Sequence, residues 1–265
     1  MPGIEPDGSP PTLPLAGLNI LVTRPAHQAE HLCQLIEQAG GGALRFPVIE
    51  ILPARDTARL ETLIDALDGF EIAIFISANA VEHGLALLNA RRKLPASLRL
   101  AAIGRSTAAA LRDSLDREPD ICPAERFDSE ALLALDEMQE VRGKHIVIFR
   151  GEGGREVLAE TLRARGATVE YADVYRRACP TADAGVLQGE AIDLITITSG
   201  EGLCNLLDMA GATGSAWLRE HQLVVLNARL AGIAHELGFV HPAVVAAKAS
   251  DDALVAAMVS WRAEH

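Results

Sequence analysis

The sequence of 265 residues has few aromatic side chains and few cysteines. Phe, Trp and Tyr together make up 4% of the chain, so its cores must be built from Ala, Leu, Val and Ile, as in parallel sheets covered by helices. The cysteines form no CxxC pair, and no histidine stands at metal-ligand spacing from them. Idle thiols in a reducing compartment are therefore favoured over a disulfide framework or a zinc site. The four cysteines are Cys33, Cys122, Cys179 and Cys204.

Positive charge is also scarce, since 24 Lys and Arg oppose 36 Asp and Glu for a net charge of -12. This balance disfavours a nucleic-acid partner and an anionic membrane surface. It is compatible with a small anionic ligand, because local Arg side chains and helix N-termini can oppose the global sign. No apolar run approaches a membrane span, and residues 1–17 lack the basic and apolar regions of a signal peptide. We expect a cytoplasmic monomer whose residues 1–17 form a disordered tail.

The chain contains an internal duplication. Residues 18–51 and 144–177 both read as an apolar strand, a polar turn, an amphipathic helix, a glycine and a second strand, and Ile20 aligns with Ile146. A second pair of blocks, 71–88 and 193–207, aligns Ser77 with Ser199. A third pair covers 98–135 and 221–258, each ending in a helix with capping residues before it, Asp128-Ser129 and Ser250-Asp251. Three matching blocks in the same order indicate two copies of one unit.

Each copy alternates strand and helix, which predicts an α/β fold of open parallel sheets with helices on both faces, similar to flavodoxin or Rossmann domains. The strands are continuous apolar runs, as expected for strands buried on both sides. In such sheets ligands bind beyond the carboxyl ends of the strands. The residues just after the predicted strands are mostly small hydroxyl residues, Gly, Asn and Arg. They are Thr23-Arg24-Pro25, Ser77-Ala78-Asn79, Gly104-Arg105-Ser106-Thr107, Arg150 to Arg155, Thr198-Ser199-Gly200 and Asn227-Ala228-Arg229.

These strand ends suit an anion, because they offer free N–H groups at helix N-termini and the forked guanidinium of Arg. The alternative is that Ser and Asn merely cap their helices. The segment 150–155 lacks the glycine spacing of nucleotide-binding loops. Tyr175, one of two tyrosines, ends a strand where the first copy has Ile49. A tyrosine hydroxyl there can donate a proton or orient a leaving group, although an amphipathic edge residue is the alternative.

Taken together, the motifs resemble the uroporphyrinogen-III synthase family over about residues 18–262. No single motif is specific, but their order and spacing are. The segments that carry the resemblance are VTRPxxQxxxL at 22–32, FPVIEI at 46–51, the strand with Ser-Ala-Asn at 72–81, IGRST at 103–107, FRGEGGREVLAETLRARGA at 149–167 and VYRR at 174–177.

The resemblance implies two domains joined by a two-stranded β linker. Domain one would be 18–47 with 178–265, domain two 54–171, and the linker strands 48–53 and 172–177, whereas the residue pattern alone fits simple tandem domains equally well. The resemblance also implies a reaction. Hydroxymethylbilane, a linear tetrapyrrole with eight carboxylates, loses water and closes with its terminal pyrrole inverted, giving uroporphyrinogen III in the cleft between the domains. No metal or organic cofactor is implied, and hydroxymethylbilane synthase is a candidate transient partner.

Site residues follow in part from the resemblance and in part from the strand ends. Tyr175 is expected to assist departure of the hydroxyl. In copy two many family members have a Thr pair where this chain has Arg229 and Leu230, and Asn227 is the candidate replacement. A two-domain binding protein for a small anion and a two-domain racemase remain alternatives, although a racemase would want paired Cys at strand ends. The expected substrate-binding residues are Thr23, Arg24, Ser77, Asn79, Gly104, Thr107, Arg150, Gly151, Arg155, Ser199, Gly200 and Asn227.

Overall fold

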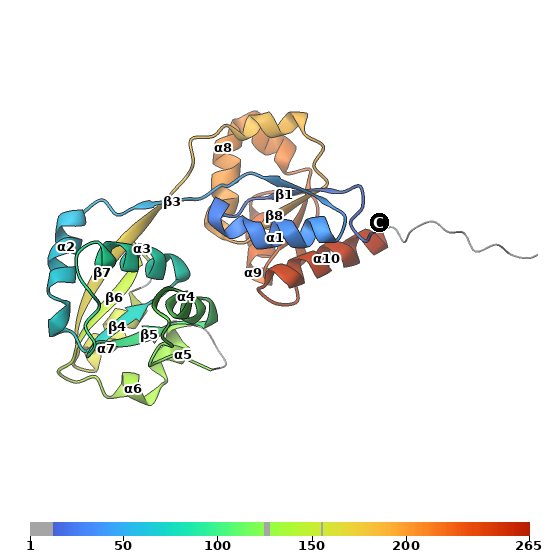
Figure 1. Ribbon diagram of the computed structural model, residues 1–265. Helices are drawn as coiled ribbons and strands as arrows, with labels where there is room; N and C mark the ends of the chain where they lie inside the picture. Colours follow the sequence, from blue (N-terminus) through green and yellow to red (C-terminus); the bar gives the residue numbers. More distant parts are fainter. Residues whose placement is uncertain (1–12, 125–127, 155) are drawn as a thin grey trace, which may run out of the picture. The chain divides into compact units, whose positions relative to one another are not determined.

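The computed structural model describes residues 13–124, 128–154 and 156–265 (Figure 1), which divide into two compact units. The first unit takes in the described residues up to Glu50 together with Ala178–His265, and the second is Ile51–Arg177. Each unit is built on a five-stranded sheet. All four neighbouring strand pairs of the first sheet are parallel, as are the pairs β4–β5, β4–β6 and β6–β7 of the second. Helices pack on both sheets, so the predicted α/β class is confirmed.

The sheet of the first unit has the strand order β10-β9-β8-β1-β2, and all four neighbouring pairs are parallel. In chain order this is the doubly wound arrangement, and the direction of winding reverses between β1 and β8. Ligands of such sheets bind at this switch point, beyond the carboxyl ends of the two strands. The strands are β1 Asn19–Val22, β2 Gly42–Arg45, β8 Leu194–Ile197, β9 Gln222–Val225 and β10 Val244–Val245.

Helices α1 (Ala26–Gln38) and α10 (Asp251–Glu264) lie side by side and pack on Ile20 and Val22 of β1 (Figure 1). Leu21 alternates with these residues and is therefore directed to the opposite face. Helices α8 (Gly200–Leu218) and α9 (Ala228–Glu236) contact β8 and β9, and the short η2 (Ala184–Gly189) packs on α8.

The second unit has the order β3-β7-β6-β4-β5, with the pairs β4–β5, β4–β6 and β6–β7 parallel. Its winding reverses between β6 and β4. Two apolar clusters fill its two faces, because successive residues of β4 alternate between them: Phe75 joins one cluster and Ile74 the other. The strands are β3 Glu50–Pro53, β4 Ile72–Phe75, β5 Arg99–Ala102, β6 His145–Gly151 and β7 Thr168–Ala178.

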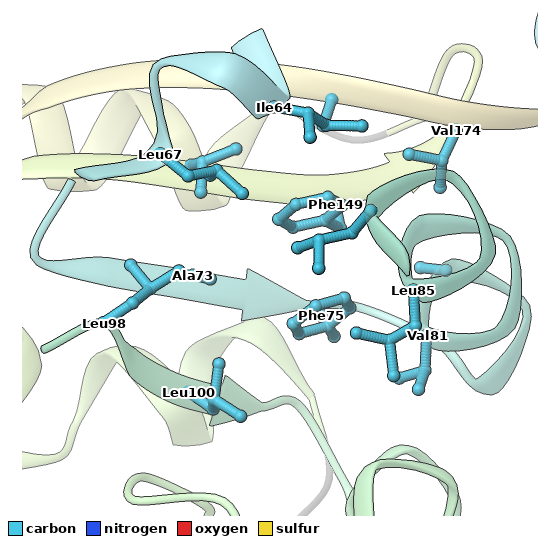
Figure 2. Packing of buried hydrophobic residues seen from close by; sticks show 14 of the residues in the cluster. Ile64, Leu67, Ala73, Phe75, Val81, Leu85, Leu98, Leu100, Phe149 and Val174 are labelled. Carbon is cyan, nitrogen blue, oxygen red and sulfur yellow. The ribbon is translucent and has the colours of Figure 1, made fainter. Parts of the chain in front are cut away.

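The Phe75 face is covered by α2 (Thr57–Asp65), η1 (Leu67–Gly69), α3 (Ala78–Asn89) and α4 (Arg105–Leu115), and Figure 2 shows its core. There the rings of Phe75 and Phe149 stack with centroids 4.6 Å apart. The opposite face is covered by α5 (Ser129–Leu133), α6 (Asp136–Gln139) and α7 (Val157–Ala164). Helices on both faces were predicted from the sequence and are observed in this unit.

The duplicated strands pair in the same register in both sheets. Ile20 of β1 pairs with Leu194 of β8, and its equivalent Ile146 of β6 pairs with Ile72 of β4, which is the equivalent of Leu194. Each sheet therefore joins the first block of one copy to the second block of the other. This shared register places the equivalent strand ends at equivalent positions of the two sheets.

The structure corrects the sequence prediction for the start of the chain. Residues 13–17 are not a disordered tail, because Leu15 is fully buried and its N–H donates to the Ala39 carbonyl at 2.8 Å; residues 1–12 lie outside the described part. The two segments predicted as linker strands, 48–53 and 172–177, include β3 and the end of β7, and these two strands are neighbours in the sheet of the second unit. In the third block of copy one, Ile121 forms a single parallel bridge with Ala101 of β5. In the described residues, no helix has the length and apolarity to cross a membrane.

Candidate functional site

The carboxyl ends of β6 and β4 meet at the switch point of the second unit, and three predicted site residues lie together there. Gly151 ends β6 and pairs with Tyr175 of β7 after a bulge between Arg150 and Gly151. Ser77 follows β4, and its hydroxyl oxygen is 3.3 Å from the Tyr175 hydroxyl oxygen. Residues predicted from three separate motifs therefore lie around the side chain of Tyr175.

The Tyr175 ring is enclosed, with 2% of the residue exposed. A Cβ on Gly151 would lie 2.7 Å from both Cε2 and Cζ of the ring, closer than carbon atoms can approach, so only glycine fits beneath it. The ring of His83 lies near it with centroids 5.7 Å apart. The alternative of an amphipathic edge residue is therefore wrong, since Tyr175 belongs to the core and its hydroxyl is held by Ser77.

Helix α3 presents Ser77 to the phenol. Ser77 is its N-cap, and the side-chain oxygen accepts the Ala80 N–H at 3.1 Å. Gly84 lets the helix approach β6 closely, because a Cβ there would lie 2.8 Å from Cδ1 of Phe149. The cap and this close packing together fix where the Ser77 hydroxyl lies.

Arg150 has a different environment from the one predicted. Its Nε donates to Asp173 at 2.8 Å and its Nη1 to Glu156 at 3.0 Å, and the guanidinium carbon lies 3.5 Å from the centroid of the Tyr171 ring. Only 7% of the residue is exposed. Two carboxylates thus already occupy most of the fork that was expected to hold substrate. Arg150 also lines a cavity of about 170 Å³ with Ile76, Ile103, Ser129, Ile148, Leu158 and Tyr171.

Tyr171 completes this cluster. Its hydroxyl donates to Glu156 at 2.5 Å. Burial, followed by this hydrogen bond, raises the pKa of Tyr171 to about 12. The same hydrogen bond, with the one from Arg150, lowers the pKa of Glu156. The cluster therefore holds a neutral phenol beside a charged carboxylate and fixes the end of β6 against β7.

At the switch point of the first unit, Thr23 and Arg24 follow β1. The Thr23 hydroxyl donates to the Thr196 carbonyl of β8 at 2.6 Å and is 3% exposed, so it joins the two strands. The Arg24 guanidinium pairs with Asp251, the first residue of α10, which also lies 3.0 Å from Nδ1 of His31. Nε of Arg24 is buried without a hydrogen-bond partner in the described residues.

The remaining predicted residues that the structure describes lie at the N-cap or in the first turn of a helix. Ser199 accepts the Gly202 N–H at 3.0 Å at the start of α8, where Gly200 is the first residue, and Asn227 accepts the Leu230 N–H at 3.1 Å at the start of α9. Gly104 precedes α4. The capping interpretation is confirmed for Ser77, Ser199 and Asn227, and a capping oxygen that accepts one amide can still make a second bond. Thr107 and Asn79 are 1% and 9% exposed. Arg155 lies outside the described residues.

Sequence reasoning missed His83 beside Tyr175 and all the carboxylates that pair with Arg24 and Arg150. Glu156 follows Arg150 by six positions across a turn, a spacing that no periodic pattern marks. Asp173 faces Arg150 through the β6–β7 register, which a single sequence does not reveal. Within the described residues, no group of three or more His, Cys, Asp or Glu side chains is arranged to hold a metal ion.

The chain is similar to a known family over most of its length. A family model described as "Uroporphyrinogen-III synthase HemD" matches residues 30–256. The uroporphyrinogen-III synthase of Escherichia coli is 35% identical over 251 residues, which cover 91% of this chain and 100% of that protein. The chain belongs to the uroporphyrinogen-III synthase family. The uroporphyrinogen-III synthase of Salmonella typhimurium is 36% identical with the same coverage.

Solved structures of the uroporphyrinogen-III synthase family share the fold. A uroporphyrinogen-III synthetase from Helicobacter pylori matches with a TM-score of 0.61 at 15% identity, covering 92% of this chain and 99% of that one. A mutant uroporphyrinogen III synthase from Thermus thermophilus matches with a TM-score of 0.60 at 16% identity, covering 93% and 98%. At these identities the likeness concerns the fold alone.

Proposed function

We propose that this chain is a uroporphyrinogen-III synthase, which closes hydroxymethylbilane to uroporphyrinogen III with loss of water and inversion of the terminal pyrrole. The observation that carries the proposal is the 35% identity to the Escherichia coli enzyme along that enzyme's whole length. The arrangement of strand ends supports it, because a substrate with eight carboxylates needs many N–H donors, and helices begin directly after β1, β4, β5, β8 and β9.

We propose that both units contribute their strand ends to one substrate, with β3 and β7 as the connection between them, as the family resemblance implies. Free N–H groups at the starts of α3, α4, α8 and α9 would hold carboxylates beside Ser77, Asn79, Gly104, Thr107, Ser199, Gly200 and Asn227. Arg24 and the less accessible Arg150 would add positive potential. The task is mainly one of positioning, since the substrate expels its own hydroxyl with electron density from the pyrrole and must then close inverted.

Tyr175 is the proposed general acid. Its proton passes to the departing hydroxyl as the C–O bond breaks, so that water leaves with the bonding electrons. The pyrrole carbon that forms the closing bond later loses its own proton, which restores the phenol, and the net change is loss of one water. Removal of the hydroxyl in Tyr175→Phe should lower kcat on the order of a hundredfold with little change in KM. Full activity in that variant would remove this role.

Three further properties of the protein are proposed from its membership of the family. The enzyme needs no metal or organic cofactor, acts as a cytoplasmic monomer, and receives its unstable substrate by transient contact with hydroxymethylbilane synthase. Activity after exhaustive chelation, and a mass independent of concentration in solution, are the expected results for the first two.

The test of the reaction uses freshly made hydroxymethylbilane. The purified chain is mixed with it, the product is oxidised, and the porphyrin isomers are resolved by chromatography. The type III isomer is expected to dominate. Type I alone, the product of spontaneous closure in a parallel sample without protein, would overturn the proposal.

A further inference from the structure

We infer that Ser77 and Gly151 are positioning residues for Tyr175 rather than ligands of the substrate: Gly151 leaves the space in which the ring lies, and Ser77 donates a hydrogen bond that turns the phenol proton outward. The inference rests on the proposed function, since it concerns the same tyrosine. It changes the roles of two residues that were expected to bind carboxylates.

The direction of the Ser77–Tyr175 hydrogen bond follows from what the serine oxygen already does. That oxygen accepts the Ala80 N–H at 3.1 Å, and a hydroxyl that accepts one bond becomes a better donor of its own hydrogen. The serine also lies at the positive end of the α3 dipole. Both effects favour Ser77 as donor and Tyr175 as acceptor over their 3.3 Å contact.

Acceptance of this bond leaves the proton of Tyr175 free for another acceptor. A phenol has one hydrogen and accepts at its oxygen. If Tyr175 donated to Ser77 instead, its proton would be held within the protein and unavailable to a departing hydroxyl. The series of contacts from the Ala80 N–H through Ser77 to Tyr175 therefore prepares a general acid before the substrate arrives.

Gly151 fixes the ring from below. A Cβ there would lie 2.7 Å from Cε2 and Cζ and 3.1 Å from the hydroxyl oxygen of Tyr175. These atoms lie at the reactive end of the ring, and a fully buried ring has little room to retreat. Gly151→Ala should therefore displace the hydroxyl from Ser77, although its own side chain adds no polar group.

The decisive experiment compares kinetics of Ser77→Ala in the presence and absence of the Tyr175 hydroxyl. A positioning role predicts a fall in kcat of about tenfold for Ser77→Ala, with KM nearly unchanged, and no further fall when Ser77→Ala is added to Tyr175→Phe. Ser77→Thr, which keeps the cap and the donor, should restore most of the activity. If Ser77 binds substrate directly, Ser77→Ala raises KM by the same factor in both backgrounds, and the inference is wrong.

Ser199→Ala is the matched control, because Ser199 is the equivalent cap of α8 and lies in the other unit. Its effect should add fully to that of Tyr175→Phe. Gly151→Ala should behave like Ser77→Ala, with loss of kcat in the parent and little extra loss in Tyr175→Phe. Independent effects of Gly151→Ala in the two backgrounds would contradict its part of the inference.

A second readout needs no activity. In a Tyr171→Phe background Tyr175 is the sole tyrosine, and the intensity ratio of its Raman ring doublet reports whether its oxygen accepts or donates. We expect the acceptor pattern, lost in Ser77→Ala and retained in Asp56→Ala, which removes the cap of α2 in the same unit. A donor pattern would overturn the direction inferred for the bond.

The failure of this inference can be distinguished from the failure of the proposed function. A type III product together with a donor pattern would reject this inference alone. An acceptor pattern together with only the type I product would reject the proposed function alone.

Discussion

The two switch points are built from equivalent residues, yet only one holds a tyrosine. In the repeat Arg24 aligns with Arg150 and Ser199 with Ser77. Each unit has an arginine at the carboxyl end of β1 or β6 and a serine-capped helix after the neighbouring strand, β8 or β4. At the equivalent of Tyr175, however, the first copy has Ile49, which is 8% exposed. The duplicated scaffold is thus shared, and the tyrosine proposed as the general acid lies in the second unit alone.

The two arginines reach their partners by different routes. Asp173, which binds Arg150, aligns with Pro47 in the first copy, so Arg24 has no such carboxylate on the neighbouring strand. It pairs instead with Asp251 at the start of α10, where a carboxylate is also favoured by the helix dipole. The position after the arginine differs too, since Pro25 stands where Gly151 makes room for the Tyr175 ring. Both arginines therefore form ion pairs at the end of their strand, although the carboxylate partners come from different elements in the two units.

The comparison predicts that Arg150 stabilises its unit more than Arg24 stabilises the other. The Arg150 side chain is 9% exposed and has two carboxylate partners, whereas that of Arg24 is 23% exposed with one. Loss of Arg150 leaves Asp173 and Glu156 without their cation. Arg150→Met should lower the free energy of unfolding of the second unit by roughly 2–3 kcal/mol, and Arg24→Met that of the first by roughly 1 kcal/mol.

The chain allows the two units to be followed separately. Both tryptophans, Trp217 and Trp261, lie in the first unit, so urea unfolding by tryptophan fluorescence reports on it, and circular dichroism reports on both. Arg91→Met is the control, because Arg91 is an exposed ion-pair residue of the same unit and its loss should lower the free energy of unfolding much less than the loss of Arg150 does. Equal losses for Arg24→Met and Arg150→Met would remove the distinction drawn between the clusters.

A smaller difference is expected between the two equivalent serine caps. Ser77→Ala and Ser199→Ala each remove an N-cap, worth about 1 kcal/mol. Ser77→Ala also leaves the buried Tyr175 hydroxyl without its partner, which adds roughly 0.5–1.5 kcal/mol. The same two unfolding signals measure both variants. A loss for Ser199→Ala as large as that for Ser77→Ala would mean that the Ser77–Tyr175 bond contributes nothing to stability.

Much of this arrangement was predictable from the sequence, for definite reasons. Apolar runs such as those at Ile72 and Ile146 mark buried strands, and the alignment of Ile20 with Ile146 predicted two equivalent sheets. Ser and Asn before apolar helices predicted the caps at Ser77, Ser199 and Asn227, because capping depends on neighbours within four residues. Capping residues, apolar runs and the internal repeat can all be recognised from residues that are close together or regularly spaced in the sequence.

Contacts between distant residues were not predictable from one sequence. The carboxylates that bind Arg24 and Arg150 are set by strand register and helix packing, so these arginines appeared open to substrate when their guanidinium groups are already paired. Burial of Tyr175 depends on the absence of a Cβ at Gly151, a fact of close packing that no periodicity carries. Leu15 likewise lies in a segment whose composition resembles a tail, and only its contact with the first unit orders it.

A last expected effect appears only at high pH and comes from the Arg150 cluster. Because the pKa of Tyr171 is raised to about 12 in the folded chain, the folded state keeps this proton above pH 10, where an unfolded tyrosine loses it. Its contribution to stability is fully present below about pH 10 and is lost as the pH rises towards 12. The first unit has Arg45 at the equivalent position, so no matching loss is expected there. Urea unfolding at intervals between pH 9 and about 11.5 should show a steeper decline for the parent than for Tyr171→Phe. Parallel declines in the two proteins would show that the raised pKa of Tyr171, due first to burial and then to its hydrogen bond with Glu156, does not couple to folding.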